Sequence, residues 1–384
     1  MRSSEKHSSA APAGRFSKTA VRPDGGGAPG RRRSPLQPAI EDDLSGAPGM
    51  CYAIRTALFG KNHMKRRVYF ISVLAELAAL AATAFDAGAA SFYVGGGSRA
   101  ALQSAINAAS AGDTILVGPG SYSVYMGFQI SRSLHVIAEK GPSATVIANF
   151  SGSRGAGSPD YGSAGFTITG AAEGFTIRGF TFRDHYKGDY EGGMWGGWGV
   201  YAMHSAGVIE GNVFERNGAA VFVMRDSRVF VRDNLMKQNG QGVQLSEAAV
   251  GEVRFNTIVG SYVAIWVGHF VAPTDVSIRN NIFSDCGYGV RNATEGLSSV
   301  SVACNDFWSC EIDCAGLSGS CVDVDGNISA DPFFCDGYYL HLGSPCLGAG
   351  APASCGGEHM GCYPTACELG AEKTSWGAVK SLFR

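Results

Sequence analysis

Four titratable side chains recur at nearly equal intervals in the middle of the chain, and acid-base chemistry is the first function that they suggest. Successive members are 21, 22 and 22 residues apart. In a repetitive fold such side chains stack on neighbouring units, where they could orient a saccharide or share a proton transfer. The alternative is a row of solvated strand ends. The four catalytic candidates are His204, Arg225, Glu247 and His269.

A second column in the same stretch is rich in aromatic residues. Each member directly follows an apolar residue that we expect to point inward, so strand alternation turns it to solvent. Flat aromatic faces along a groove can stack on the apolar faces of sugar rings. The alternative is packing beneath a neighbouring loop. The column contains Tyr201, Phe222, Gln244, Trp266 and Arg291, and Tyr201 and Trp266 are its carbohydrate-binding candidates.

The segment RDHYKGDYEGGMWGGW (183–198) lengthens one repeat to 32 residues, counted from Ile177 to Ile209. Long loops on a rigid scaffold often carry function, although a glycine-rich loop without a role is the alternative. Its aromatic candidates for carbohydrate binding are Tyr186, Trp195 and Trp198. Its candidate metal ligands are Asp184, Asp189 and Glu191. No firm cofactor is predicted, and calcium is the ion that these carboxylates suit best.

Composition favours a turn-dense all-β fold and excludes several classes of protein. Glycine accounts for 54 of 384 residues, and only 17% of residues are charged, which excludes a disordered chain. The net charge of −2 gives no reason to expect nucleic-acid binding. A basic stripe of arginines at 178, 232, 254 and 279 could meet an acidic polysaccharide, but pairing with neighbouring carboxylates is favoured.

The elements that position these candidates are predicted by internal repeats. A strand motif recurs five times with an asparagine at a fixed place, and the asparagines are 22, 22, 25 and 24 residues apart. A second strand keeps the same period, which is typical of a β-solenoid. Stacked amides can satisfy polar groups at a buried bend, so we interpret the asparagines as structural. They are Asn212, Asn234, Asn256, Asn281 and Asn305.

Two flanking segments make a family resemblance specific. ALQSAINAASAGDTILVGPGSYS (101–123) resembles the opening of secreted right-handed parallel β-helix proteins of the pectate-lyase-like superfamily, and ADPFFCDGYYLHLGSPCLGAG (330–350) resembles their closing motif. The resemblance implies an all-β, right-handed parallel β-helix of about eight or nine coils. It also implies an N-terminal helical cap and a cysteine-rich C-terminal cap. The superfamily includes lyases, hydrolases, epimerases and adhesins, and no complete catalytic motif of these enzymes is present.

The predicted function is interaction with an extracellular polysaccharide, without cleavage. The alternative is a polysaccharide lyase that acts on uronate-containing polymers by β-elimination, with Arg or His as the base. We expect a monomer whose partner is the polysaccharide.

Residues 64–90 have the basic, apolar and small-residue order of a secretory signal peptide. The predicted organisation is an extension or mis-assigned start (1–63), the signal peptide (64–90), the β-helix with its N-terminal cap (91–310), a disulfide-rich cap (311–367) and a tail (368–384). A signal anchor with a disordered cytoplasmic tail is the alternative. We expect a secreted or cell-surface protein without a membrane span in its mature form.

Ten of the eleven cysteines lie between Cys286 and Cys367, which predicts five disulfides in an oxidising compartment. A zinc site formed by close cysteine pairs is the alternative. Cys286 and Cys310 lie eight residues after equivalent strand positions one coil apart. A bond between these two cysteines is therefore the single pairing that the spacing predicts.

Overall fold

The computed structural model describes residues 89–124, 127–149, 164–170, 173–185, 188–190, 193–268, 272–294, 296–348, 355–363 and 366–367. They belong to a compact unit of residues 85–384. The predicted extension (1–63), nearly all of the signal peptide (64–90) and the tail (368–384) lie outside the described residues. Within the described ranges no helix is long and apolar enough to span a membrane.

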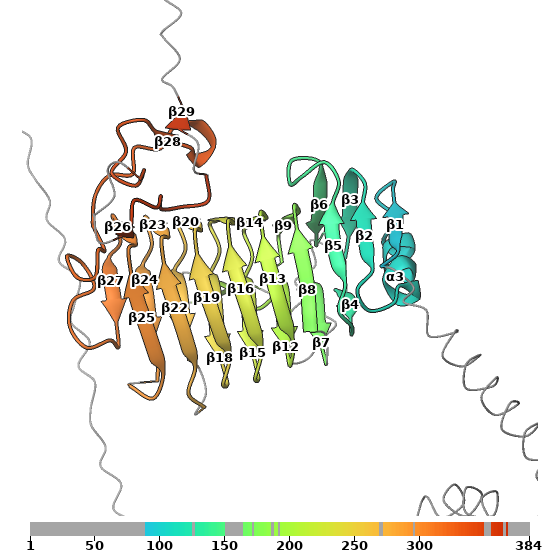
Figure 1. Ribbon diagram of the computed structural model, residues 1–384, viewed down its shortest axis with the longest axis horizontal. Helices are drawn as coiled ribbons and strands as arrows, with labels where there is room; N and C mark the ends of the chain where they lie inside the picture. The colour runs from blue at the N-terminus through green and yellow to red at the C-terminus, as the bar shows by residue number, and fades with distance from the viewer. Residues whose placement is uncertain are drawn as a thin grey trace, which may run out of the picture. The chain divides into compact units, whose positions relative to one another are not determined.

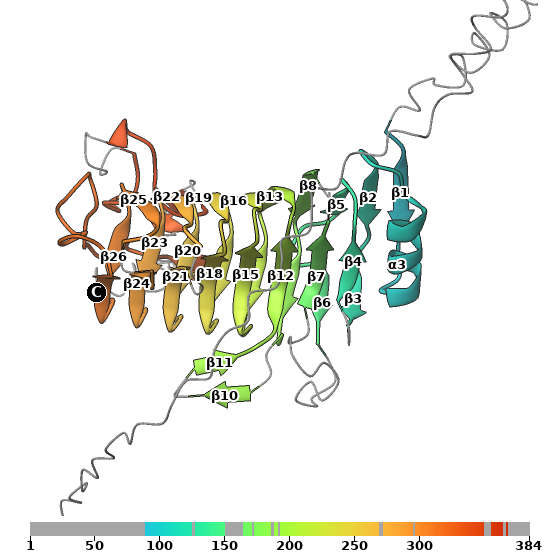
Figure 2. The same cartoon turned by 90° about the horizontal axis from the view of Figure 1, so that it is seen from below.

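The fold is the predicted parallel β-helix, in which three parallel sheets of nine, eight and eight strands wind around one core (Figures 1 and 2). Sheet A contains β1 (Ser91–Val94), β2 (Thr114–Val117), β5 (His135–Ala138), β8 (Glu173–Arg178), β13 (Ala206–Glu210), β16 (Arg228–Arg232), β19 (Val250–Arg254), β22 (Asp275–Arg279) and β25 (Ser299–Ala303). Sheet B contains β3 (Gly120–Ser123), β6 (Thr145–Ala148), β9 (Thr181–Arg183), β14 (Val213–Glu215), β17 (Leu235–Lys237), β20 (Thr257–Val259), β23 (Ile282–Ser284) and β26 (Asp306–Trp308). Sheet C contains β4 (Phe128–Ile130), β7 (Ala164–Thr169), β12 (Trp198–Met203), β15 (Ala219–Met224), β18 (Gln241–Ser246), β21 (Val263–Val267), β24 (Tyr288–Asn292) and β27 (Ile312–Ala315). The chain visits the sheets in the order A, B, C in each coil, so the predicted count of eight or nine coils is confirmed.

Few elements lie outside the three sheets. Helix α3 (Arg99–Ala108) begins at Ser98, whose hydroxyl accepts a hydrogen bond from the backbone N–H of Ala101. It buries Leu102 and Ile106 and contacts β1, β2 and β4. The remaining elements are the antiparallel pair β10 (Gly188–Tyr190) and β11 (Gly193–Trp195), the short helix η1 (Asp336–Tyr338), and the parallel pair β28 (Leu340–His341) and β29 (Ala366–Cys367).

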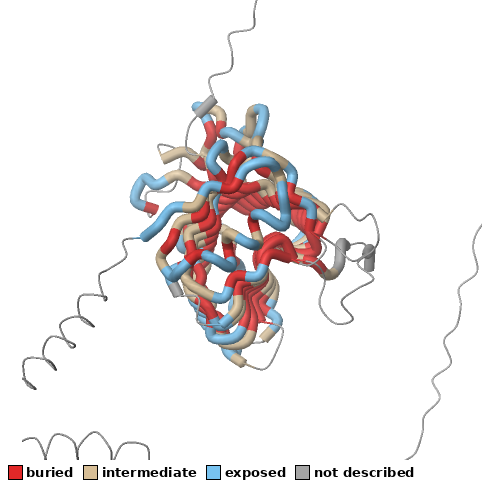
Figure 3. Tube along the Cα trace, turned by 90° about the vertical axis from the view of Figure 1, so that its right-hand side faces the viewer, coloured by how far each residue is buried: buried red, intermediate tan, exposed pale blue. Residues whose placement is uncertain are grey.

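Buried residues line up from coil to coil along the β-helix (Figure 3), and their apolar members form one core cluster. The predicted inward column of sheet C is fully buried, with 0% exposure for Val200, Val221, Val243, Ile265 and Val290. The small residues that precede these positions make close packing possible. A Cβ on Gly199 would lie 2.5 Å from the Phe214 ring of sheet B, and one on Gly289 would lie equally close to the Phe307 ring. These glycines therefore leave room for aromatic side chains across the core.

The asparagine column lies at the bend between sheets A and B, and its predicted structural role is confirmed. The Oδ1 atom of Asn256 accepts from both the backbone N–H and the Nδ2 of Asn234, at 3.1 and 3.0 Å. The Nδ2 of Asn256 donates to the Val231 carbonyl at 2.9 Å. The same bonds continue through Asn327, one coil beyond the predicted column. Because these residues are buried, no water replaces a lost bond.

A second ladder, at the bend between sheets B and C, was not predicted. The Nδ2 of Asn217 and of Asn239 donates to the carbonyl of the preceding coil, and each Oδ1 accepts from a backbone N–H one coil earlier. Three later coils place Ser261, Cys286 and Cys310 at this position, each five residues after a ladder asparagine.

The predicted Cys286–Cys310 disulfide is wrong, because both residues are free thiols. Their sulfurs occupy the place of the ladder amides: Cys286 donates to the Ile258 carbonyl and Cys310 to the Phe283 carbonyl. The predicted register holds, yet the thiols bond to the backbone of the preceding coil. The prediction of five disulfides fails with it, since Cys346 and Cys362 are also free. Described disulfides join Cys304 to Cys355 and Cys314 to Cys321.

Replacing Asn256 by Leu is expected to lower the free energy of unfolding by about 1 to 3 kcal/mol, because buried donors and acceptors on two neighbouring coils lose their partners. Chemical denaturation of purified protein measures this change. Asn107→Leu, on the exposed face of α3, is the matched control and should change stability by less than about 0.5 kcal/mol. Equal stability of Asn256→Leu and wild type would show that the ladder is dispensable.

Candidate functional site

The outer face of sheet C carries the predicted aromatic column. Val200 and Ala202 of β12 point into the core at 0% exposure, whereas Tyr201 between them is half-buried on the outside. Parallel pairing places Tyr201 beside Phe222, then Gln244, Trp266 and Arg291 on successive coils. We call Trp198 and these five residues the sheet C face. Equivalent positions on neighbouring coils are about 4.8 Å apart.

The aromatic residues at one end of the sheet C face pack on one another. The ring of Trp198 stacks on Tyr201 with centroids 5.0 Å apart, and Phe222 lies 5.5 and 5.6 Å from these two rings. Phe222 retains only 7% exposure, so Trp198 and Tyr201 form the accessible part of this cluster. Phe222 therefore has a packing role, which was the alternative to sugar binding. Trp198 and Tyr201 keep part of their surface exposed.

A cation and aromatic rings form the other end of the sheet C face. The Arg291 guanidinium lies 4.6 Å from the Trp266 ring centroid and 5.2 Å from that of Tyr288. The Trp266 indole donates to the Gly268 carbonyl at 2.6 Å, which fixes the plane of its ring. Within the described ranges no carboxylate pairs with Arg291. Its in-plane N–H groups are therefore suited to polar or anionic groups of a ligand.

The titratable column lies at the bend from sheet C to sheet A. His204, Arg225 and Glu247 have positive φ angles of 48°, 54° and 53°, and they occupy one column as predicted. The Arg225 Nε donates to Glu247 Oε2 at 2.9 Å, whereas His204 Nδ1 lies 3.9 Å from Asp226. Two of the candidates therefore neutralise each other. His269 lies outside the described residues.

The long insertion between β9 and β12 contains the hairpin β10–β11 (Figure 2). Arg216 donates to both carboxylate oxygens of Asp184, at 2.8 and 3.2 Å, so this candidate metal ligand is held by a guanidinium. For Asp189 and Trp195 the structure describes the backbone alone, and Tyr186 and Glu191 lie outside the described residues. The calcium prediction therefore stays a prediction.

The arginine stripe on the outer face of sheet A is paired, as favoured from the sequence. Glu210 accepts from Arg232 at 2.7 Å and lies 3.8 Å from Arg178. Glu252 lies 3.0 and 3.4 Å from Arg279 and Arg254. Exposed ion pairs of this kind contribute little to stability. They do, however, pair the arginine charges that an acidic polysaccharide would need.

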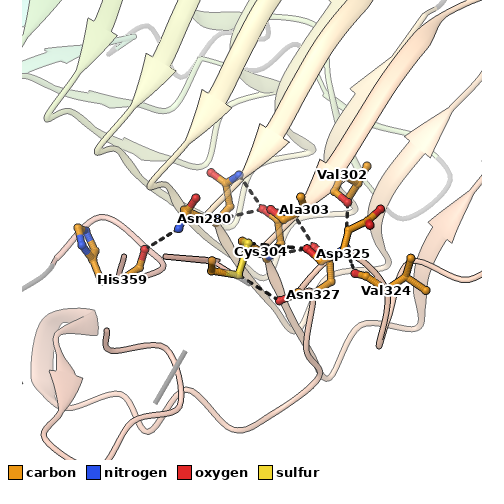
Figure 4. The surroundings of a disulfide bond; sticks show 12 residues. Asn280, Val302, Ala303, Cys304, Val324, Asp325, Asn327 and His359 are labelled. Atoms are coloured by element: carbon orange, nitrogen blue, oxygen red, sulfur yellow. Dashed lines mark hydrogen bonds between the residues drawn. A yellow bond between two sulfur atoms is a disulfide. The ribbon is translucent and has the colours of Figure 1, made fainter. Parts of the chain in front are cut away.

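Sheet B is covered by a segment that sequence reasoning did not place. The C-terminal strap, residues 355–363, crosses three coils on its outer face, next to the bend with sheet A. Gly361 N–H donates to the Asn280 carbonyl at 2.9 Å, and Cys362 N–H donates to the Thr257 hydroxyl at 3.1 Å. The Cys304–Cys355 disulfide fixes its start, and Asn280 Nδ2 donates to the His359 carbonyl (Figure 4). This part of sheet B is therefore closed to ligands.

A buried acid lies under the chain that leads to the strap. Asp306, in the outward column of sheet B, has 0% exposure. Its carboxylate accepts from the Ala330 backbone N–H at 3.0 Å and from the Cys346 thiol at 3.3 Å. Burial raises the pKa of Asp306 to about 7, and the Ala330 N–H offsets only part of that rise. In the folded protein the protonated form is therefore favoured below about pH 7.

Comparisons with known proteins agree with this architecture. The family model described as "Periplasmic copper-binding protein (NosD)" matches residues 126–316, a range that contains the coils from β4 to β27. The chain is a parallel β-helix repeat protein. A search of curated proteins found no match to this β-helix protein.

Three solved structures illustrate its structural neighbours. An alginate lyase from Paenibacillus sp. str. FPU-7 is 14% identical, with a TM-score of 0.41 over 57% of this chain and 76% of the lyase. PfbA, a surface adhesin of Streptococcus pneumoniae, is 18% identical, with a TM-score of 0.44 over 58% of this chain and 63% of the adhesin. Pectin methylesterase from carrot is 11% identical, with a TM-score of 0.31 over 65% of this chain and 90% of the esterase. The β-helix protein therefore spans less than two thirds of the adhesin.

Asp306→Asn is expected to remove a pH dependence of stability. Because the folded pKa is raised from 3.8 to about 7, the contribution of Asp306 to stability is fully present below the unfolded pKa. It is lost as the pH rises from about 4 through 7, by on the order of 2 to 4 kcal/mol. The neutral amide keeps an acceptor for Ala330, so the variant should become more stable than wild type at pH 8.

Thermal unfolding of both proteins between pH 4 and pH 9 measures this difference. Asp275→Asn, an exposed aspartate on sheet A, is the control for removing one carboxylate. Parallel stability curves for wild type and Asp306→Asn would contradict the prediction.

Proposed function

We propose that the protein binds an extracellular polysaccharide along the sheet C face and does not cleave it. The observation that carries this proposal is the alignment, at one position per coil, of aromatic rings, an amide and a guanidinium that has no carboxylate partner among the described residues. Half-buried aromatic rings offer flat apolar surfaces for sugar faces. Arg291 adds donors that can bind hydroxyl or carboxylate groups, and Gln244, with 9% exposure, lies between the rings.

The regular spacing supports a polymer rather than a small ligand. A column with one member about every 4.8 Å along a rigid axis presents side chains at regular intervals. A chain of sugar units also repeats its contacts, so several weak subsites can act together. The half-buried rings at both ends of the face, Trp198 with Tyr201 and Trp266, are separated by Gln244. This arrangement suits a ligand that extends over several coils.

The ion pairs of the candidate residues favour binding over catalysis. Glu247 is engaged by Arg225, and Asp184 is engaged by Arg216. A carboxylate held by a guanidinium must give up that ion pair before it can coordinate a metal ion. The alternative, a lyase that acts by β-elimination on uronate polymers, would need an Arg or His base beside the bound sugar. Arg291 favours that alternative, because it lies on the sheet C face with no described carboxylate partner.

Extracellular location is part of the proposal. The Cys304–Cys355 and Cys314–Cys321 disulfides are typical of proteins that fold in an oxidising compartment. A polysaccharide outside the cytoplasm is therefore the available partner. The signal peptide predicted at residues 64–90 supports the same location.

The description of the matching family model names copper. Within the described ranges, no three His, Cys, Asp or Glu side chains are grouped as a metal site. Soft sulfur ligands select Cu(I) among the biological metals. The thioethers of Met203 and Met224 both contact the Tyr201 hydroxyl, so the described donor set does not fit copper.

Replacing Trp198 and Trp266 together by Ala is expected to weaken polysaccharide retention by about tenfold, because each ring supplies a large apolar contact. Affinity electrophoresis in gels containing alginate, polygalacturonate or a neutral glucan measures the retention. Phe230→Ala is the matched control, since Phe230 is an exposed aromatic residue on sheet A with 48% exposure. Unchanged retention of the double variant on every polymer that wild type binds would exclude this face.

The lyase alternative has its own measurement. Incubation of the protein with uronate polymers, with and without calcium, should produce no rise in absorbance near 235 nm, because a binding protein forms no unsaturated product. A rise that is lost in Arg291→Gln would establish the lyase instead.

A further inference from the structure

The outer surface of sheet C carries almost no charge. In the eight strands of this sheet the charged residues are Arg291 of β24 and Asp313 of β27. Asp313 lies at the register position of Gly289, next to the Phe307 ring and outside the outward columns. Arg291 is therefore the one charged side chain in the outward columns of the described strands. A ligand on this face meets rings, methyl groups, amides and hydroxyls instead of ions.

Sheet A shows how this β-helix treats charge where it does carry it. Glu210 and Glu252 each pair with two arginines of the outer face, at 2.7 to 3.8 Å. A polyanion needs a cation for each carboxylate that it brings to the surface. On sheet A the arginines of the stripe already have carboxylate partners, and on sheet C a row of cations is absent from the described strands. Neither face is therefore suited to an acidic polymer.

The charges around the Arg291 end of the sheet C face are negative. Asp285 and Glu311 are exposed at the bend between sheets B and C, just before β24 and β27, and no ion pair of the described residues involves them. Residues 292–372 contain eleven Asp and Glu and no Lys or Arg. A polymer with one carboxylate per sugar unit would be repelled by these groups as it approached Arg291.

The aromatic rings favour the same class of ligand. The face of an aromatic ring carries partial negative charge, which attracts the C–H groups of sugars and repels carboxylates. The Arg291 guanidinium lies 4.6 and 5.2 Å from the ring centroids of Trp266 and Tyr288. These two rings therefore already interact with its positive charge. Its N–H groups can still donate to sugar hydroxyls.

We infer that the polysaccharide of the sheet C face is neutral, with sugar units that carry hydroxyl groups and neither carboxylates nor sulfates. The inference rests on the polysaccharide binding proposed above and names the class of polymer. A carboxylate laid on Trp198, Tyr201 or Trp266 would lose water without gaining a cation, which is unfavourable. An uncharged sugar face on the same rings has no such cost.

Matched pairs of polymers test the inference with the full chain. One kind of pair is a neutral glucan and the same glucan after oxidation of its C6 hydroxyls to carboxylates, for glucans of several linkages. The reverse pair is polygalacturonate and its methyl ester. Affinity electrophoresis measures the retention. We expect about tenfold stronger retention on the neutral member of each retained pair. Retention on that member should be unchanged between about 0.02 and 0.5 M NaCl, because it involves no ion pair.

Arg291→Gln separates a charge contact from a hydroxyl contact. The amide keeps hydrogen-bond donors but loses the charge and the guanidinium plane. We expect the variant to weaken retention on both members of a pair by the same factor, about twofold to fivefold. Arg228→Gln, at an exposed arginine of sheet A, is the matched control and should be retained like wild type. A melting temperature unchanged from wild type shows that each variant is folded.

The outcomes distinguish the class of polymer from polysaccharide binding itself. Equal or stronger retention on the charged member of a pair would overturn the inference and leave polysaccharide binding intact. A loss in Arg291→Gln that is confined to charged polymers would overturn it as well, because Arg291 would then bind carboxylates. Retention on none of the polymers would refute the proposed function, and the inference with it.

Discussion

Buried hydrogen bonds between neighbouring coils are the interaction on which the rest of this structure depends. A solenoid bends sharply three times per coil, and each bend leaves backbone groups without sheet partners. The amide of Asn256 bonds to a carbonyl of the coil before it and to an amide of the coil after it. The ladder therefore supplies hydrogen-bond partners for the backbone groups at the bend and also sets the register between coils. Every outer column, including the sheet C face, inherits its alignment from this register.

Much of the fold could be predicted because it repeats. The repeated asparagine, such as Asn234, predicted the bend between sheets A and B. The repeated apolar residue, such as Val221, predicted the strand of sheet C. The second ladder escaped notice because its members change identity along the axis, from Asn217 to Ser261 to Cys286. Cys286 lies at the predicted position, but its thiol donates to a carbonyl of the preceding coil instead of forming the predicted disulfide.

The C-terminal strap could not be predicted from the sequence, because its partners follow no period. Cys362 bonds to Thr257, which lies 105 residues earlier in the chain. The candidate site was foreseen in its residue types, since strand alternation alone exposes Tyr201 and Trp266. The charge pattern of the candidate site could not be predicted, because the pairing of Arg225 with Glu247 depends on side-chain geometry at a bend with positive φ.

The strap also depends on the register of the coils beneath it. Its contacts reach Thr257, Asn280 and Cys304, which belong to three successive coils. None of these contacts can form until the coils have stacked in their final register, and a slip by one coil would separate Cys355 from Cys304. The Cys304–Cys355 disulfide therefore joins the strap to the stack in the native register. Once closed, it holds together the end of the solenoid where a terminal coil would otherwise peel away.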